Sequence, residues 1–141
     1  SLRAVVDRKA MGEITVTLDC DVLNADGGTR CASITGAYVA MVLAFRKLRE
    51  TNVIKSMPML GQVAAVSCGI FQSNPVLDLD YAEDSSAEAD ANFILTAAGG
   101  IVEIQATAEK STFDERAFNA LLGLARKGTS ELFAAQKAAL S

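Results

Sequence analysis

A double glycine between an alternating segment and a long apolar segment most constrains how this chain folds. Residues 14–18 (Ile-Thr-Val-Thr-Leu) alternate apolar and polar side chains, which is typical of a half-buried strand. Gly27 and Gly28 follow an acidic stretch, and from about Arg30 to Glu50 apolar residues recur at helical spacing. The order strand, glycine turn, helix fixes where one helix begins, and the first N–H groups of any helix lack backbone partners.

The start of this helix is a candidate anion site. Gly28 lets backbone approach a ligand closely, Thr29 offers a hydroxyl, and Arg30 offers a planar fork that suits phosphate or carboxylate. The positive end of the helix macrodipole favours an anion at the same place. The spacing equally fits an ordinary turn with an arginine on its rim, so the residues alone leave both interpretations open.

A second candidate lies in residues 83–90, which carry four carboxylates. This density suits a cation or general acid–base chemistry, and it also suits a solvated turn. On a helix Asp84 and Glu88 share a face, whereas Asp84 and Asp90 are about 120° apart. Asp84 and Asp90 therefore reach one ion only if the segment bends or forms a single turn before a strand. We keep Glu88 as a further candidate.

Composition excludes several kinds of chemistry. The 141 residues include no histidine, which removes histidine-based triads, general bases and metal ligands. Cys20, Cys31 and Cys68 show no C-x-x-C spacing, so we expect reduced thiols in a cytoplasmic protein and no zinc site. The net charge of −4 argues against a general nucleic-acid binder, although a local basic groove is compatible with it.

The order of predicted elements indicates an α+β fold, with antiparallel strands and helices packed on one side, in a single domain over residues 1–141. Two uncharged runs, residues 31–45 and 56–77, are predicted to be buried core and not membrane spans. The predicted elements are a helix over 2–10, a strand over 13–23, a helix over 30–50, strands over 62–71 and 76–81, strands over 92–96 and 101–107 around a glycine turn, and a helix from a capping box at 112–115 to 140.

Several short sequence motifs (words) of this chain resemble motifs of the bacterial ribonuclease PH family. The resemblance extends over essentially the whole chain, in the same order, and it is specific because the words are unusual. A family sequence is longer, and this chain is similar to its C-terminal part only, with the N-terminal part absent. The matching words lie at residues 18–23, 25–30, 32–37, 78–81, 83–85, 87–88, 90, 103–105, 107–109, 121–122, 124–126 and 136–140.

The resemblance implies a partial RNase PH-type fold, assembled as dimers in a hexameric ring. It implies a phosphate-dependent 3′→5′ exoribonuclease that trims tRNA precursors and releases nucleoside diphosphates. Inorganic phosphate would bind at Gly28, Thr29 and Arg30. Asp84 and Asp90 would hold Mg²⁺, or one of them would protonate the leaving oxygen. The alternatives are a truncated, inactive subunit that acts only in assembly, and an anion- or nucleotide-binding module unrelated to RNA.

Overall fold

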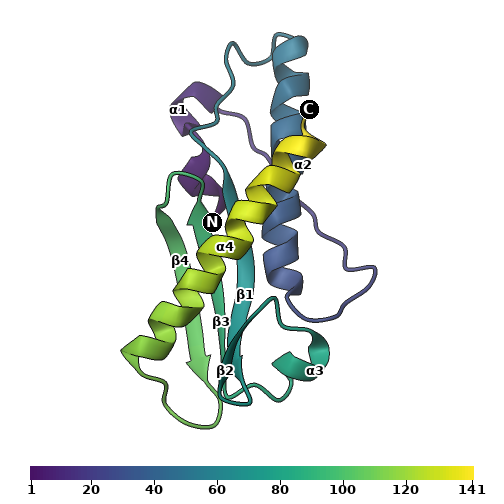
Figure 1. The fold of residues 1–141 in the computed structure, drawn as a ribbon. Helices are drawn as coiled ribbons and strands as arrows, with labels where there is room; N and C mark the ends of the chain where they lie inside the picture. The colour runs from purple at the N-terminus through teal and green to yellow at the C-terminus, as the bar shows by residue number, and fades with distance from the viewer.

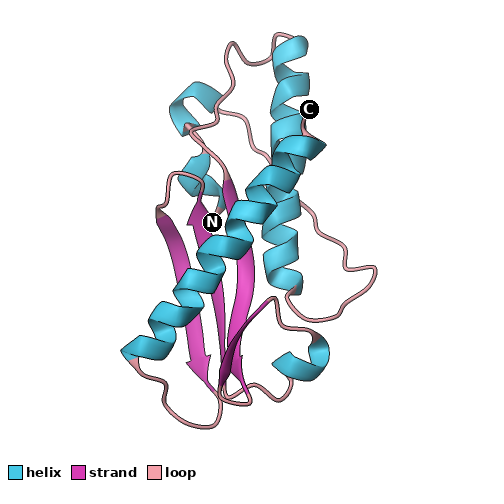
Figure 2. Ribbon diagram, in the orientation of Figure 1, coloured by secondary structure: helices cyan, strands magenta, loops and turns pink.

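A four-stranded antiparallel sheet with the strand order β2-β1-β3-β4 lies at the centre of the chain, and two long helices pack against it (Figures 1 and 2). The computed structural model describes all residues, 1–141. The elements are η1 (Leu2–Val5), α1 (Arg8–Met11), α2 (Thr29–Glu50), β1 (Val63–Phe71), β2 (Asn74–Leu77), α3 (Tyr81–Asp84), β3 (Ala89–Thr96), β4 (Ile101–Ala108) and α4 (Glu115–Ala139).

Strand β1 is buried on both faces and divides the core in two. Val63 and Ala65 belong to a cluster with residues of α2, whereas Val66 and Cys68 belong to a cluster with residues of α4. Because successive side chains of a strand point to opposite faces, α2 and α4 lie on opposite sides of the sheet. The predicted α+β class and antiparallel sheet are confirmed, but the expected packing of the helices on one side is wrong.

Helix α2 spans the predicted segment, and its apolar stripe is buried. Ala37, Tyr38, Met41 and Phe45 are each less than 9% exposed. By length and hydropathy alone α2 would suffice to cross a membrane, as many core helices would. Packing against the sheet and residues 1–20 accounts for the apolar residues of this stripe.

The predicted helix over residues 2–10 is interrupted. Val6 forms an isolated antiparallel bridge with Met59, and Asp7 then begins a new turn by accepting hydrogen bonds from the backbone N–H groups of Lys9 and Ala10. The result is two short elements, η1 and α1, because an aspartate side chain at this position satisfies the first N–H groups of the second one.

The predicted strand over residues 13–23 is wrong. No backbone group between residues 13 and 27 makes a backbone–backbone hydrogen bond. The alternation itself survives, since Ile14, Val16 and Leu18 are half-buried against the α2 core cluster while Thr15 and Thr17 are exposed. A strand needs a neighbouring strand for its backbone groups, and no strand lies beside this segment.

The two hairpins follow the predictions closely. Strands β1 and β2 meet in a tight turn at Gln72 and Ser73, both with positive φ, and β2 begins at Asn74, two residues before the predicted start at 76. Strand β2 ends at Leu77, before the predicted end, because Asp78 has φ of 59°. Helix α4 is capped by Asp114, which accepts from the Ala117 N–H, and not by the threonine of the predicted capping box.

We predict a sharp contrast in amide hydrogen exchange between two segments. Amides of residues 13–25 should exchange at the rates of unstructured peptide, since no backbone hydrogen bond protects them. Amides of β1 and β3 should be slow, since they pair over eight residues inside the core. Mass-spectrometric exchange measures both, and protection of residues 13–25 comparable with that of β1 would contradict the structure.

Candidate active site

The start of α2 is held against the start of α3 by a close approach of backbone to backbone. Gly27 and Gly28 both have positive φ, 75° and 62°. A Cβ on Gly27 would overlap the carbonyl oxygen of Leu79. Only glycine therefore fits here, and its absent side chain lets the α2 N-terminus lie beside residues 79–80.

Asp26 adds a polar tie between the same two segments. Its Oδ1 accepts a hydrogen bond from the backbone N–H of Tyr81 at 3.0 Å. Helix α3 is a single turn with a capping box, in which Asp80 accepts from the Glu83 N–H and Glu83 accepts from the Asp80 N–H. Three acidic residues of the sequence thus act as local caps and ties, and this leaves Asp84 at the end of the turn.

Asp84 and Asp90 act on each other electrostatically. The chain makes one turn at α3 and then enters β3, where Asp90 pairs with Thr107 of β4 and Gly69 of β1. The pKa of Asp90 is raised, first by burial, then by the negative charges of Asp84 and Glu109. The chain thus meets the stated condition, a single turn leading into a strand, and whether both carboxylates reach one ion stays a prediction.

The carboxylates suit a magnesium ion only together with other ligands. No three His, Cys, Asp or Glu side chains are grouped closely enough to hold a metal by themselves. Mg²⁺ commonly uses one or two carboxylates and completes its shell with water and substrate phosphate. Asp84 and Asp90 fit that requirement, because a cation between them would relieve the repulsion that raises the pKa of Asp90. Glu88 does not join them: its Oε1 accepts from the Ser73 N–H at the β1–β2 turn.

Arg30 meets a carboxylate that the sequence did not single out. Its Nη2 donates to Glu103 Oε1 at 2.5 Å, and the side chains are 45% and 38% exposed. The first turn of α2 contains no acidic residue and Gly28 provides no side-chain cap. Two carboxylates from other parts of the chain approach this helix start: Glu103 contacts Arg30, and Asp78 Oδ1 lies 3.9 Å from the place of a Cβ on Gly28.

The predicted anion-binding and carboxylate residues form two separate groups. Arg30 is over β4 at Glu103, whereas Asp90 pairs with Thr107, four residues further along the same strand, which is roughly 13 Å. Arg30 is not among the charges that shift the pKa of Asp90. Thr29 lines a groove on another side of α2, with residues 18–24.

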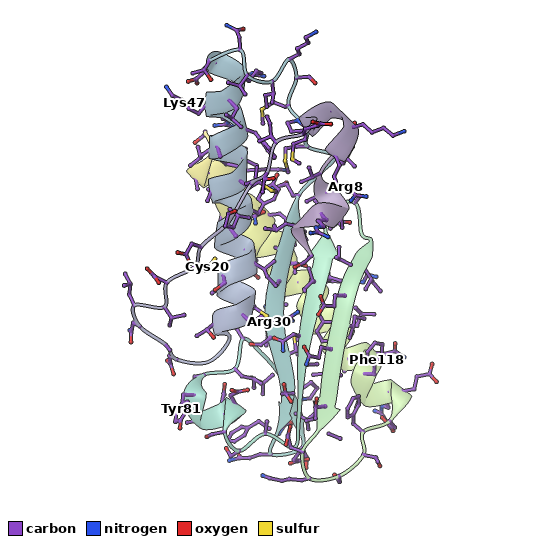
Figure 3. The ribbon with its side chains drawn as sticks, turned by 180° about the vertical axis from the view of Figure 1, so that it is seen from behind. Arg8, Cys20, Arg30, Lys47, Tyr81 and Phe118 are labelled. Atoms are coloured by element: carbon purple, nitrogen blue, oxygen red, sulfur yellow. The ribbon has the colours of Figure 1, made fainter.

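Beyond the start of α2, the sheet face on the α2 side becomes polar. Register puts Ser67 opposite Asn92, and Asn92 opposite Gln105, on the face that carries Asp90 and Thr107. Figure 3 shows this lower part of the sheet free of any covering helix, with Arg30 at the foot of α2. Part of this polar face was predictable, because the alternation in residues 103–109 indicated outward polar side chains. Ser67 and Asn92 were not predictable as part of it, because they lie in or beside segments that are mainly apolar or acidic.

The buried thiols are not nucleophiles. Burial raises the pKa of Cys31 to about 11 and that of Cys68 to about 12. The Cys31 Sγ–H donates to Asn92 Oδ1 at 2.9 Å. Both cysteines are thus neutral core groups, in agreement with the expectation of reduced thiols, and Cys20 is free as well.

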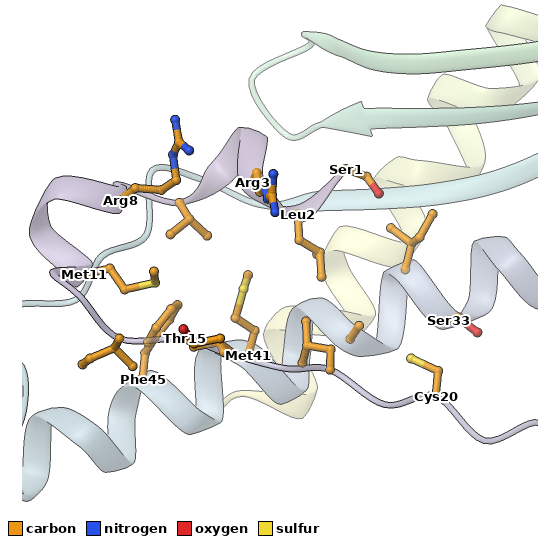
Figure 4. Close-up of a pocket in the computed structure, with 16 residues that line it drawn as sticks. Ser1, Leu2, Arg3, Arg8, Met11, Thr15, Cys20, Ser33, Met41 and Phe45 are labelled. Atoms are coloured by element: carbon orange, nitrogen blue, oxygen red, sulfur yellow. The ribbon is translucent and has the colours of Figure 1, made fainter.

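The largest cavity lies elsewhere and is mostly apolar. It measures about 770 Å³ between residues 1–20 and α2, and Met11, Met41 and Phe45 are among its lining residues (Figure 4). No aspartate or glutamate lines it, so it has no part in carboxylate chemistry.

Comparisons with known proteins agree with the fold and with the family indicated by the sequence motifs. Residues 61–128 match the family model described as "3' exoribonuclease family, domain 2". Two relatives named ribonuclease PH, from Caulobacter vibrioides and Methylobacterium radiotolerans, are 64% and 57% identical over 140 and 141 residues, or 99% and 100% of this chain. The chain spans 59% and 60% of their lengths.

Solved structures share the fold at low sequence identity. Rice Rrp46 superposes with a TM-score of 0.66 at 16% identity, covering 82% of this chain and 49% of that one. A structure titled "Archaeal exosome core" gives 0.62 at 19% identity, covering 82% and 47%. These likenesses confirm the RNase PH-type fold. They leave the predicted single domain over residues 1–141 and the roles of individual site residues as predictions.

We predict that Gly27→Ala destabilises the chain by about 2 kcal/mol or more. The new Cβ would require a strained positive φ and would clash with the Leu79 carbonyl oxygen. Urea unfolding at neutral pH measures the loss. Gly61→Ala is the matched control, since a Cβ there meets no atom within 4 Å. Equal unfolding midpoints for the two variants would contradict the close approach.

We predict that Asp84→Asn lowers the pKa of Asp90, and that Glu109→Gln lowers it less, because Asp84 is the stronger of the two repulsive charges. Carbon-13 NMR titration of the Asp90 carboxyl measures both shifts. The raised pKa means that the folded chain holds this proton more tightly than the unfolded chain. Asp90 therefore costs stability at neutral pH, and the cost disappears as pH falls to the ordinary aspartate pKa of 3.8.

Proposed function

This chain belongs to the ribonuclease PH family and carries its second domain, and from this premise we propose that it is part of a phosphate-dependent 3′→5′ exoribonuclease. The enzyme would shorten RNA 3′ ends, those of tRNA precursors among them. An oxygen of inorganic phosphate attacks the phosphorus of the last phosphodiester, and the bond to the preceding ribose 3′ oxygen breaks. The products are a nucleoside diphosphate and an RNA shorter by one nucleotide.

The main electrostatic difficulty of this reaction is that a phosphate dianion must approach a phosphodiester. Positive groups that hold both reduce the repulsion, and such stabilisation is usually the largest part of catalysis. The N-terminus of α2 supplies unpaired N–H groups after Gly28, the Thr29 hydroxyl and the Arg30 guanidinium. We assign the attacking phosphate to this helix start.

The two aspartates suit the opposite end of the reacting bond. Burial and a neighbouring negative charge raise the pKa of Asp90, which favours a carboxyl that can carry a proton to the leaving oxygen. Asp84 lies at the end of the α3 turn, where it would face the same phosphoryl group. If Mg²⁺ binds, Asp84 and Asp90 would hold it, and the ion would neutralise charge that develops on the phosphoryl oxygens.

The observation that supports this proposal most directly is the close approach of Gly27 to Leu79. It brings an uncapped helix N-terminus and the acidic turn of α3 to adjoining places in the fold, although they are more than 50 residues apart in sequence. Phosphoryl transfer from RNA to phosphate needs charged groups near both reacting oxygens. On this proposal the backbone N–H groups of the helix start serve the phosphate beside the α3 turn, while Arg30 lies at Glu103 in the free chain.

Partners follow from the family. RNA with a free 3′ end and inorganic phosphate are the proposed substrates, and identical subunits would assemble as dimers in a hexameric ring in the cytoplasm. Exosome structures among the fold neighbours support assembly as the general mode for this fold. The chain's net charge of −4 means that any RNA-binding groove must be local, or shared with the rest of the protein.

Two observations favour a second candidate, a subunit that assembles but does not catalyse. Residues 13–27 form no backbone–backbone hydrogen bonds, and Arg30 is engaged by Glu103. On this alternative the free backbone and the polar sheet face would contact other subunits, and no nucleoside diphosphate would form.

We predict nucleoside diphosphate release from a short RNA only when inorganic phosphate is present. Arg30→Ala should lower kcat/KM for phosphate about ten- to hundredfold, the loss expected for a charge-assisted hydrogen bond. Asp90→Asn should lower kcat about 10²- to 10⁴-fold, as for loss of a general acid or metal ligand. Chromatographic separation of the nucleotides measures both.

Arg49→Ala is the matched control, because it removes an arginine at the other end of the same helix. Wild-type protein that assembles but releases no product with or without phosphate would favour the structural subunit. Phosphate binding that is lost in Arg30→Ala without any RNA product would indicate an anion-binding module unrelated to RNA.

A further inference from the structure

An anionic side chain already contacts Arg30, the arginine of α2 to which we assign phosphate binding. The Arg30 guanidinium donates to the Glu103 carboxylate, in one of only two ion pairs in the chain. The other pair, Lys47–Glu50, lies at the opposite end of the same helix and joins neighbours on one helix face. Arg30–Glu103 is thus the one ion pair that joins different elements, α2 and β4.

The pairing of β4 with β3 determines where the Glu103 side chain starts. The register between β3 and β4 shifts at Ile94 and Leu95: Ile94 pairs with Glu103, whereas Leu95 pairs with Ile101. Val102 is the extra residue of this bulge, and it packs against the α2 core cluster. Bulges re-aim side chains at the ends of strands, and this one presents Glu103 to the start of α2.

We propose that the Glu103 carboxylate competes with inorganic phosphate for the Arg30 guanidinium. Phosphate must displace Glu103 from Arg30 in order to bind. Carboxylate and phosphate oxygens use the same guanidinium donors, so one Nη2 cannot serve both fully. The displacement is feasible because both side chains are substantially exposed, and exposed ion pairs are weak. Glu103 would therefore set the phosphate concentration at which the site fills.

The geometry gives the competition a further consequence. While Arg30 contacts Glu103, its guanidinium is held over β4, away from the level of Asp90. Phosphate that replaces Glu103 would draw the guanidinium to the helix N-terminus, beside the α3 turn. This inference rests on the proposed phosphate site, but it concerns affinity for phosphate and needs no RNA to be tested.

The test is Glu103→Gln, which keeps the size and an acceptor oxygen and removes the charge. Isothermal titration with inorganic phosphate, without RNA, should show two- to fivefold tighter binding than wild type, the range expected for loss of an exposed ion pair. The KM for phosphate should fall by the same factor. The matched control is Glu50→Gln, which removes the other ion-paired carboxylate and changes the net charge equally; its phosphate affinity should equal that of wild type.

Each other result has a definite meaning. Unchanged phosphate affinity in Glu103→Gln, or no phosphate binding by any form, would overturn the proposal. Weaker binding would also overturn it and would make Glu103 a positioning residue that orients Arg30. Tighter phosphate binding without nucleoside diphosphate release in any form would uphold the competition and contradict the proposed function. Urea unfolding of both variants checks that the fold is intact.

Discussion

The pairing of β1 with β3 is the constraint on which the rest of the structure depends. Eight residue pairs fix the register, and because side chains alternate, a shift by one residue would exchange the two faces. In this register Val63 and Ala65 enter the core beneath α2, and Val66 and Cys68 enter the core beneath α4. The same alternation places Asp90 on the face of the sheet that packs against α2. Asp90 lies beyond the N-terminal start of α2, where no apolar layer covers this face.

The proposed site consequently lies at a junction of three segments. The turn before α2 contributes glycine and backbone, the α3 turn contributes Asp84, and the polar end of β3 contributes Asp90. Close backbone contact at Gly27 is what joins them, and the Asp26 hydrogen bond to Tyr81 supports it. Asp26, Glu83 and Glu88 act as caps or ties through their hydrogen bonds, which separates them from Asp84 and Asp90, whose carboxylates make no such bond.

Charge in this region is arranged in two ways that matter for function. The charge of Asp84 repels that of Asp90, and together with burial it raises the pKa of Asp90, so the folded chain favours a proton on Asp90. Arg30 is neutralised by Glu103, so the free chain presents less positive charge to an anion than the sequence implies. A bound phosphate would reverse the second arrangement, and a bound cation would relieve the first. On the proposed function, the phosphate and the cation would thus each offset an unbalanced charge of the free site.

Local patterns were sufficient wherever an element is stabilised by neighbours close in sequence. Helix α2 begins directly after the double glycine, both hairpins form around their predicted turns, and α4 begins within the predicted cap region. The single turn before β3 is one of the two conditions considered for Asp84 and Asp90 to meet, and the Asp80–Glu83 capping box stabilises it. The predicted strand over residues 13–23 was wrong because alternation indicates which side chains can be buried, but it does not indicate whether a partner strand is present.

The sequence by itself determined the family, the α+β class, the start of α2 and the identities of Arg30, Asp84 and Asp90 as candidates, because these depend on local words, periodicity and residue chemistry. Only the tertiary structure decided that α2 and α4 take opposite faces of the sheet, since this depends on the β1–β3 register. It alone decided that Glu103 engages Arg30, because a bulge between β3 and β4 joins residues 73 positions apart. Contacts of this kind arise from the pairing of distant strands, which no local pattern records.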